Sequence, residues 1–223
     1  MELTVVLRAA MNWASVVRQV KTAASPGALV AAVQRVAEWP EPSQAIPLLI
    51  EVLGYNNPAA AQVAIASLQR WGRQAVPDLL TRLDGYNYGA RAYAVRVLAH
   101  IGDPRALEVL EQAARYDFAP SVRRAAIRGL GNIQWQELAT PEPLQERVAQ
   151  ALRDLSGDGD WGIRYAVIVA WELWHQRGLP GFLQPQMDAL LQQLAQDEDR
   201  VVQARAQWVL QRSDKYVTMP KEV

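Results

Sequence analysis

The sequence predicts an all-α protein built as a solenoid of stacked helical hairpins, an α/α superhelix of about five repeats with an N-terminal helix. Three observations predict this class. Proline and glycine cut the chain into pieces of helical length, no alternating strand pattern stands between them, and equivalent positions recur at intervals of 30, 32, 41 and 39 residues. Because one hairpin cannot bury its apolar stripe alone, the hairpins must stack, and the inner wall of such a rod is a natural binding surface.

The N-terminal region, residues 1–40, is predicted to form capping or docking helices, followed by the repeats over 41–211 and a tail over 212–223. One helix is expected to begin this region, with an apolar side made of Val5, Val6, Ala9, Trp13, Val16 and Val20. The charged residues Glu2 and Arg8 and the polar stretch after them fit neither a signal peptide nor a membrane span. A cytoplasmic location is therefore expected.

The second helix of each predicted hairpin begins alike, which defines the register of the repeats. The reference column is Ala61, Arg91, Arg123, Arg164 and Gln203. Four residues earlier stand Asn57, Asn87, Ala119, Asp160 and Asp199. The Asn and Asp residues of this earlier column are predicted to cap the free backbone N–H groups of the first helical turn. Where alanine breaks the pattern, Pro120 follows it and partly replaces the cap by fixing φ.

Two further columns predict the buried face of these helices. Three residues after the reference come Ala64, Ala94, Ala126, Val167 and Ala206, and seven after it come Leu68, Leu98, Leu130, Trp171 and Leu210. Small side chains at the first position allow close helix approach, and large ones at the second fill the layer between hairpins. The preceding helices are amphipathic too, with stripes that include Ile46 and Leu49, Val76 and Leu79, Leu107 and Leu110, Val148 and Leu152, and Leu190 and Leu194. This combination is typical of HEAT-like repeats.

Composition argues against several classes of function. The 223 residues include 23 basic and 23 acidic side chains and no basic run, so nucleic acid is a poor candidate partner. The absence of cysteine excludes a disulfide, a thiolate metal ligand and a thiol nucleophile. The two histidines, His100 and His175, end different predicted helices and lack acids at metal-ligand spacing. Neither a metal site nor histidine catalysis is expected.

Three successive repeats carry arginine in the reference column: Arg91, Arg123 and Arg164. With helix layers roughly 8 to 10 Å apart, these residues can present a ladder of guanidinium groups that grips carboxylates. The alternative is structural. In that interpretation each arginine pairs with an acid of its own or the next repeat, Asp84, Asp117 or Asp160, and stiffens the stack.

Aromatic and acidic side chains surround the starts of the same helices. They are Tyr86, Asn87 and Tyr88, then Asp117 and Phe118, then Asp160, Trp161 and Tyr165. Such loops open onto one edge of a stack, where residues are free to serve function. The combination suits a flat, extended, anionic ligand, because rings stack on its faces, arginine holds its acid groups and a carboxylate accepts its N–H groups. Alternatively, the rings cover apolar loop surface.

The central third of the chain resembles a known family. Residues 79–107 read LLTRLDGYNYGARAYAVRVLAHIGDPRAL, and residues 116–135 read YDFAPSVRRAAIRGLGNIQW. Both resemble the E/F-type phycobilin lyases, which are built of HEAT-like repeats, and in particular the smaller, F-type (beta) subunits. The motifs GYNNP, GYNYGAR, IGDPRAL and SVRRAA follow one another in the family's order over residues 46–135, and the repeat pattern with WGIRYAV continues to residue 211.

The resemblance implies a heterodimer with a larger, homologous E-type subunit. Such a heterodimer attaches phycocyanobilin, an open-chain tetrapyrrole with two propionates, through a thioether to a cysteine of the phycocyanin alpha subunit. It also implies a substrate bilin without an intrinsic cofactor, and neither a nucleic-acid nor a membrane partner. Isomerase activity is not expected, because the isomerising relatives depend on a His-Cys pair and this chain has no cysteine.

The residues expected near pigment or partner are Tyr86, Tyr88, Arg91, Asp117, Arg123, Arg124, Trp161 and Arg164. Asp117 is the candidate acid that favours the protonated tetrapyrrole. A second hypothesis comes from a different class of protein. It is a HEAT-repeat adaptor or pigment-binding protein for phycobilisome assembly or turnover that makes no bond.

Overall fold

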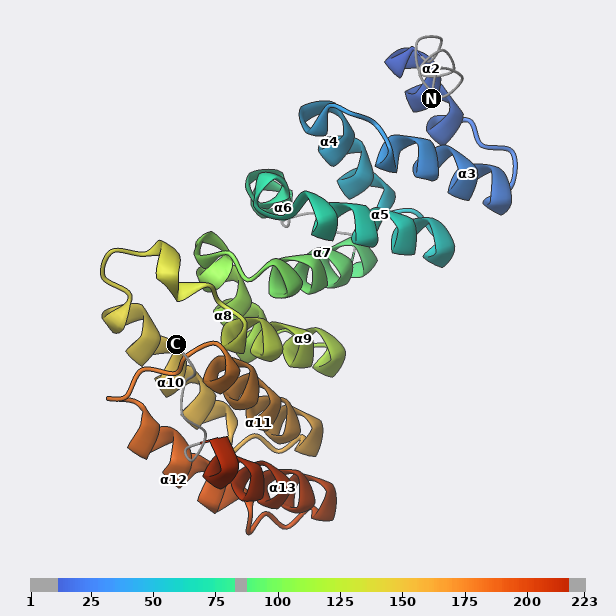
Figure 1. The fold of residues 1–223 in the computed structure, drawn as a ribbon. Helices are drawn as coiled ribbons and strands as arrows, with labels where there is room; N and C mark the ends of the chain where they lie inside the picture. Colours follow the sequence, from blue (N-terminus) through green and yellow to red (C-terminus); the bar gives the residue numbers. More distant parts are fainter. Residues whose placement is uncertain (1–11, 83–87, 217–223) are drawn as a thin grey trace. The chain divides into compact units, whose positions relative to one another are not determined.

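The computed structural model describes residues 12–82 and 88–216, with side chains described as far as residue 212. Over these ranges the regular structure consists of α-helices and short 3-10 helices and contains no strand (Figure 1). The all-α prediction is therefore confirmed. The chain divides into two compact units, residues 1–97 and 98–223, and each is described by itself.

The first unit consists of paired helices in two layers. Its elements are α2 (Trp13–Lys21), α3 (Pro26–Ala37), α4 (Pro42–Val52), α5 (Pro58–Trp71), η1 (Gly72–Ala75), α6 (Val76–Thr81) and α7 (Tyr88–Ile101) up to residue 97. Helix α3 packs against α5, while α4 packs against α5 and α6. Pairing of α4 with α5 is the first hairpin that the sequence predicted.

The structure corrects the prediction of one continuous helix at the start of the chain, because Asn12 is a helix cap. This residue has extended backbone angles, φ −82° and ψ 131°, and its side-chain oxygen accepts the N–H of Ala14 at 3.0 Å. Asparagine is a favoured N-cap because its oxygen satisfies a free N–H of the first turn. A single helix running from Val5 through Val20 is therefore wrong, and α2 begins at Trp13. Val5, Val6 and Ala9 lie outside the described residues.

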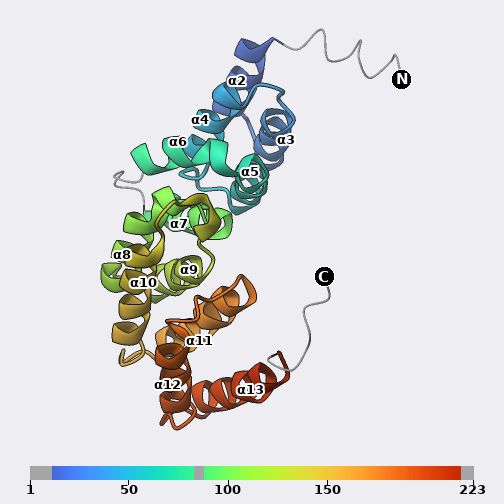
Figure 2. The same cartoon turned by 60° about the vertical axis from the view of Figure 1, so that its left-hand side comes forward.

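The second unit repeats the hairpin three times. After the end of α7 come η2 (Pro104–Ala106), α8 (Leu107–Tyr116), α9 (Pro120–Gly131), η3 (Trp135–Glu137), α10 (Glu142–Leu155), α11 (Trp161–Gln176), α12 (Gln184–Leu194) and α13 (Arg200–Tyr216). Helices α9, α11 and α13 pack in one layer, and α8, α10 and α12 form the other (Figure 2). This is the predicted stacking of one hairpin on the next.

The first buried column is confirmed, and the second is confirmed at four of its five positions, because Leu210 is only partly buried. All five small residues of the first column are buried, and Leu68, Leu98, Leu130 and Trp171 of the second are almost fully enclosed. Full burial of one such side chain contributes roughly 1.5 to 3 kcal/mol. The close approach of α9 to α11 needs glycine at Gly131, because a Cβ atom there would lie 2.1 Å from the carbonyl oxygen of Ala170.

The predicted caps begin three of the second helices. Asn57 accepts the N–H of Ala60 at 3.0 Å, Asp160 accepts the N–H of Gly162 at 2.7 Å, and Asp199 accepts the N–H of Val201 at 2.8 Å. Asn87 lies outside the described residues. At α9 no side chain caps the helix at Ala119, and Pro120 occupies the first helical position as predicted. Each cap ends a loop at the point where that loop turns into the helix carrying the reference column.

Candidate functional site

In the first unit the predicted site residues stand at the start of α7. Tyr88 is its first residue and is half exposed, and the guanidinium carbon of Arg91 lies 5.7 Å from the centre of its ring. This distance is suitable for a cation–π contact, which orients the guanidinium along the helix. Tyr86 lies outside the described residues. The pair therefore presents a ring and a cation side by side.

In the second unit Asp117 and Phe118 lie on the loop before α9, and Trp161 is the first residue of α11. Phe118 is 75% exposed and Trp161 is 49% exposed. The Trp161 ring meets that of Tyr165 edge to face, with 6.5 Å between ring centres. Asp117 ends α8, and its Oδ1 atom accepts the N–H of Ala119 at 2.9 Å. Two large apolar rings are thus held at the solvent edge of neighbouring hairpins.

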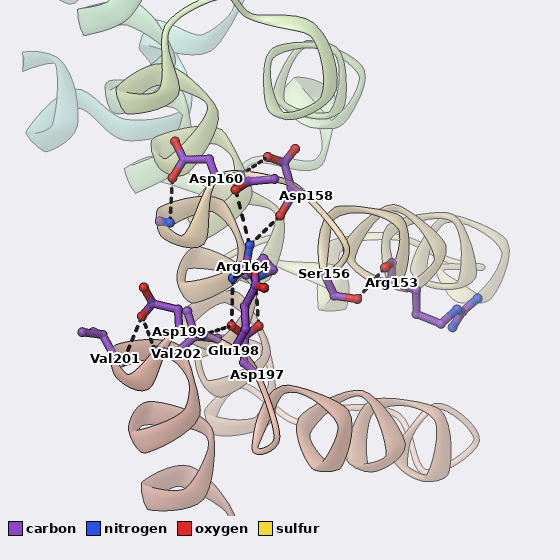
Figure 3. A network of polar contacts seen from close by, with 12 residues as sticks. Arg153, Ser156, Asp158, Asp160, Arg164, Asp197, Glu198, Asp199, Val201 and Val202 are labelled. Carbon is purple, nitrogen blue, oxygen red and sulfur yellow. Dashed lines mark hydrogen bonds and ion pairs between the residues drawn. The ribbon is translucent and has the colours of Figure 1, made fainter.

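Arg164 does not face solvent. Its side chain is 8% exposed and makes a two-pronged contact with Asp197, with Nε–Oδ2 and Nη2–Oδ1 distances of 2.8 Å each (Figure 3). Nη1 also donates to the carbonyl oxygen of Asp158 at 2.8 Å. Hydrogen bonds from Arg164 hold the pKa of Asp197 below its ordinary value, and the same bonds raise the pKa of Arg164. The guanidinium joins the start of α11 to the loop before α13.

Arg123 makes an equivalent set of contacts in the preceding repeat. Its Nε donates to the carbonyl oxygen of Ala114 at 2.9 Å, and Nη2 binds Oδ2 of Asp158. Burial raises the pKa of Asp158, but hydrogen bonds from Arg123 and from the N–H of Asp160 leave it below its ordinary value. For Arg123 and Arg164 the structural interpretation of the arginine column therefore holds.

The acids that receive these two arginines differ from the expected ones. Asp158 and Asp197 take the place of Asp117 and Asp160 as their partners, and Asp84 lies outside the described residues. The physical reason is a shared turn. Asp117, Asp158 and Asp197 each stand two residues before a helix cap and accept the N–H of the cap residue, at 2.9, 2.9 and 2.8 Å. The second oxygen of Asp158 also binds Arg123, and both oxygens of Asp197 bind Arg164.

Sequence reasoning missed this turn, although a signal was present. Aspartate stands six residues before the reference column in three successive repeats, at Asp117, Asp158 and Asp197. The recurrence of a short acidic side chain at a fixed distance before a cap indicates a turn in which the side chain accepts a nearby backbone N–H.

Arg124 is the solvent-facing guanidinium near these loops. Its side chain is 40% exposed, and Nη1 lies 3.7 Å from Oδ2 of Asp160. An ion pair of this length and exposure contributes about 1 kcal/mol or less. The guanidinium is therefore available to an acidic group of a ligand or partner beside Trp161.

The two histidines lie near the C-terminal ends of α7 and α11. His175 stacks on Trp171 with 4.9 Å between ring centres and 7° between planes, and His100 is exposed near the end of α7. In the part of the chain that the structure describes, no three histidine or acidic side chains gather in a group able to hold a metal ion. None of the helices described there is long and apolar enough to cross a membrane.

Comparisons with known proteins identify the family. The HEAT-repeat family matches residues 76–172 and 117–211. The phycocyanobilin lyase subunit beta of Nostoc sp. PCC 7120 is 48% identical over 188 residues, which cover 83% of this chain and 92% of that protein. The chain belongs to the phycocyanobilin lyase beta-subunit family. The resemblance stated from the sequence is confirmed.

One more relative and one solved structure extend this result. The phycocyanin alpha phycocyanobilin lyase CpcF of Synechocystis sp. PCC 6803 is 43% identical over 199 residues, covering 87% of this chain and 91% of that protein. Among solved structures, the complex of CpcE and CpcF of phycocyanin lyase from Nostoc sp. PCC 7120 contains a chain that matches with a TM-score of 0.68 and 48% identity. That match covers 74% of this chain and 98% of the other.

In this family member the predicted site residues of the second unit fall into two groups. Arg123 and Arg164 are engaged in bonds between repeats, whereas Phe118 on the loop before α9, Arg124 on α9 and Trp161 at the start of α11 face solvent. The second group has the ring faces and the cation that a flat acidic ligand requires. A role of any of these residues in pigment or partner binding stays a prediction.

Proposed function

We propose that this chain is the beta subunit of a heterodimeric phycocyanobilin lyase. With an E-type subunit it attaches phycocyanobilin by a thioether to a cysteine of the phycocyanin alpha subunit. The observation that carries the proposal is the 48% identity to a phycocyanobilin lyase subunit beta, over 92% of that protein's length. The match to the CpcE–CpcF complex supports a heterodimer.

The chemistry of attachment fits a chain without cysteine. The thiol of the acceptor adds across the double bond of the bilin's ethylidene group, so sulfur bonds to carbon and the proton passes to the pigment. Neither an oxidant nor a leaving group is needed. Because the chain holds no thiol of its own, it cannot retain the pigment as a competing thioether. Its contribution is to bind the pigment non-covalently and to present it in one orientation.

Within this proposal the exposed loop residues orient pigment or partner. Trp161 and Phe118 offer ring surfaces, Arg124 offers a cation for a propionate, and Asp117 is the candidate acid near the protonated tetrapyrrole. Tyr88 and Arg91 offer the same chemistry in the first unit. We also propose that the protein works in the cytoplasm.

Co-expression tests the proposal. The chain, its E-type partner, phycocyanobilin and the phycocyanin alpha subunit are produced together, and acid-stable colour on the alpha subunit is measured after denaturing electrophoresis. We expect colour with all four components and little without this chain. Equal colour in its absence removes the lyase assignment.

One relative favours a second candidate function. The phycobilisome maturation protein of Synechococcus elongatus is 45% identical over 168 residues, and its name refers to maturation of the phycobilisome without naming pigment attachment. In this alternative the chain binds pigment or phycobilisome proteins as an adaptor. The same co-expression separates the two, because an adaptor changes phycobilisome assembly while pigment attachment proceeds without it.

A further inference from the structure

The first unit contains a cavity of about 470 Å³ where the C-terminal ends of α3 and α5 meet. Its lining comes from two short segments, residues 35–40 and residues 70–71. The volume lies within the range of about 300 to 1,000 Å³ that is usual for small-molecule sites. None of the residues expected from the sequence to bind pigment lines it.

The lining combines three kinds of chemistry. Trp39 and Trp71 supply indole surfaces, Arg35 and Arg70 supply guanidinium groups, and Glu38 supplies a carboxylate. Basic residues in the last turn of a helix are common, because they complement the helix dipole, so the arginines alone indicate no ligand. Two large rings, two cations and one acid around a single cavity are the set that a flat molecule with acid groups and ring N–H groups requires.

Neighbouring contacts orient this lining. Nη2 of Arg70 donates to the carbonyl oxygen of Ala37, which holds the guanidinium between the two helix ends. Nη1 of Arg35 donates to Oε1 of Gln19 at 2.6 Å. A guanidinium has five N–H donors, so both arginines keep donors for a further acceptor.

Trp39 is held in the same way. Its indole N–H donates to Oε1 of Gln44 at 3.2 Å, and its ring packs against Trp13 with 5.1 Å between ring centres. Each contact lies within the first unit. The ring is therefore placed before any ligand binds, which lowers the entropy lost on binding.

We propose that this cavity binds part of the bilin, one pyrrole ring with its propionate, and so forms a pigment site outside the loops of the second unit. The inference rests on the proposed function, which supplies the bilin as ligand. One propionate binds Arg35 and Arg70, the pyrrole stacks on Trp39 and Trp71, and Glu38 accepts a pyrrole N–H. Two positive charges and one negative charge line the cavity, which favours an anion.

A titration of the purified heterodimer with phycocyanobilin tests the site, with bound pigment followed by its absorbance. We expect Arg35→Gln to weaken pigment affinity about tenfold, as the loss of a charge-assisted hydrogen bond does. Trp71→Phe, which keeps a smaller ring, weakens it less. The matched control is Arg18→Gln, which removes the same charge from α2 of the same unit outside the cavity and leaves affinity unchanged.

A chemically altered pigment provides a second readout, which begins with the wild-type protein. Phycocyanobilin dimethyl ester has no free propionate, so the wild-type heterodimer binds it about tenfold more weakly than the acid. In Arg35→Gln the difference between the affinities for the acid and for the ester should be smaller than in the wild type. Circular dichroism of each variant verifies that the helices are intact.

The outcomes separate this site from the proposed function. Wild-type affinity in Arg35→Gln and Trp71→Phe, with normal attachment of colour to phycocyanin alpha, overturns the cavity site and leaves the lyase function standing. If only Trp161→Ser or Arg124→Gln lowers the pigment affinity, and the cavity variants do not, the pigment binds beside Trp161 and Arg124 in the second unit and the cavity site is overturned. A wild-type heterodimer that binds no pigment overturns the cavity site outright.

Discussion

Replacement of Arg164 by methionine tests whether the buried ion pair joins the repeats of the second unit. The side chains of Arg164 and Asp197 are 8% and 7% exposed, and two hydrogen bonds of 2.8 Å connect them. The substitution leaves the Asp197 carboxylate enclosed without its counter-charge, which costs roughly 3 to 5 kcal/mol when one partner of a buried pair is removed. The result should be a large loss in the free energy of unfolding.

The matched control is Arg124→Gln on the adjoining helix. Its partner Asp160 lies 3.7 Å away in a solvent-exposed pair, so the loss should be about 1 kcal/mol or less. Urea unfolding followed by circular dichroism measures both. Hydrogen exchange of peptides from α11 and α13 shows whether the loss is located where the pair joins these helices.

A double-mutant cycle isolates the pair from other effects of the substitutions. Asp197→Asn keeps an oxygen for the N–H of Asp199 while removing the charge. We expect the double variant with Arg164→Met to cost roughly 2 to 3 kcal/mol less than the sum of the single variants, the upper part of the range for residues in contact. Additive losses, or a loss for Arg164→Met no greater than for Arg124→Gln, would refute the reasoning.

Three further outcomes are expected. The folded pKa of Asp197 is lowered, so its contribution to stability is present above its unfolded pKa, near 3.9, and is lost as pH falls through the folded value. The gap in unfolding free energy between wild type and Asp197→Asn, measured by urea titration, should therefore narrow below about pH 4. Gly131→Ala should cost at least about 1 to 3 kcal/mol because its Cβ has no room, while Gly159→Ala, with open space around it, should change thermal unfolding little. In the co-expression assay Arg91→Ala should reduce pigment attachment, and unchanged attachment would remove Arg91 from the site; Arg123→Ala should lower the melting temperature, because it removes the bonds to Ala114 and Asp158.

The fold was predictable because each hairpin carries, at fixed spacing, the residues that set the register of its second helix. A cap, a small residue seven positions later and a large one four positions after that follow directly from helical geometry, and the structure buries Ala64, Ala126, Leu68 and Leu130 as expected. Only local spacing is needed for this. The start of the chain was harder, because Asn12 fits a polar position within a helix as well as a cap, and the spacing alone does not distinguish them.

The candidate site was less predictable because it depends on which side chains meet between repeats. Arg123 and Arg164 occupy the same column as Arg91, and sequence spacing assigns them one environment. Their partners come from loops 35 and 33 residues further along, whose turn geometry decides which acid faces each arginine. The cavity between α3 and α5 escaped notice for the same reason, since residues 35–40 and 70–71 belong to different hairpins.

The arrangement of charges also indicates that different side chains serve stability and ligand recognition. Arg123 and Arg164 direct their hydrogen-bonding groups at an aspartate of the neighbouring repeat. If either guanidinium bound a ligand instead, Asp158 or Asp197 would be left enclosed and unpaired. Recognition is therefore expected from side chains that break the repeat pattern. Such residues in the second unit are Phe118 before α9 and Trp161 at the start of α11. In the first unit they are Arg35, Trp39 and Trp71, near the ends of α3 and α5. Substitution of the exposed Phe118, Trp161 and Arg35 should change pigment handling at little cost in stability, which is the opposite of what the buried arginine pairs should show.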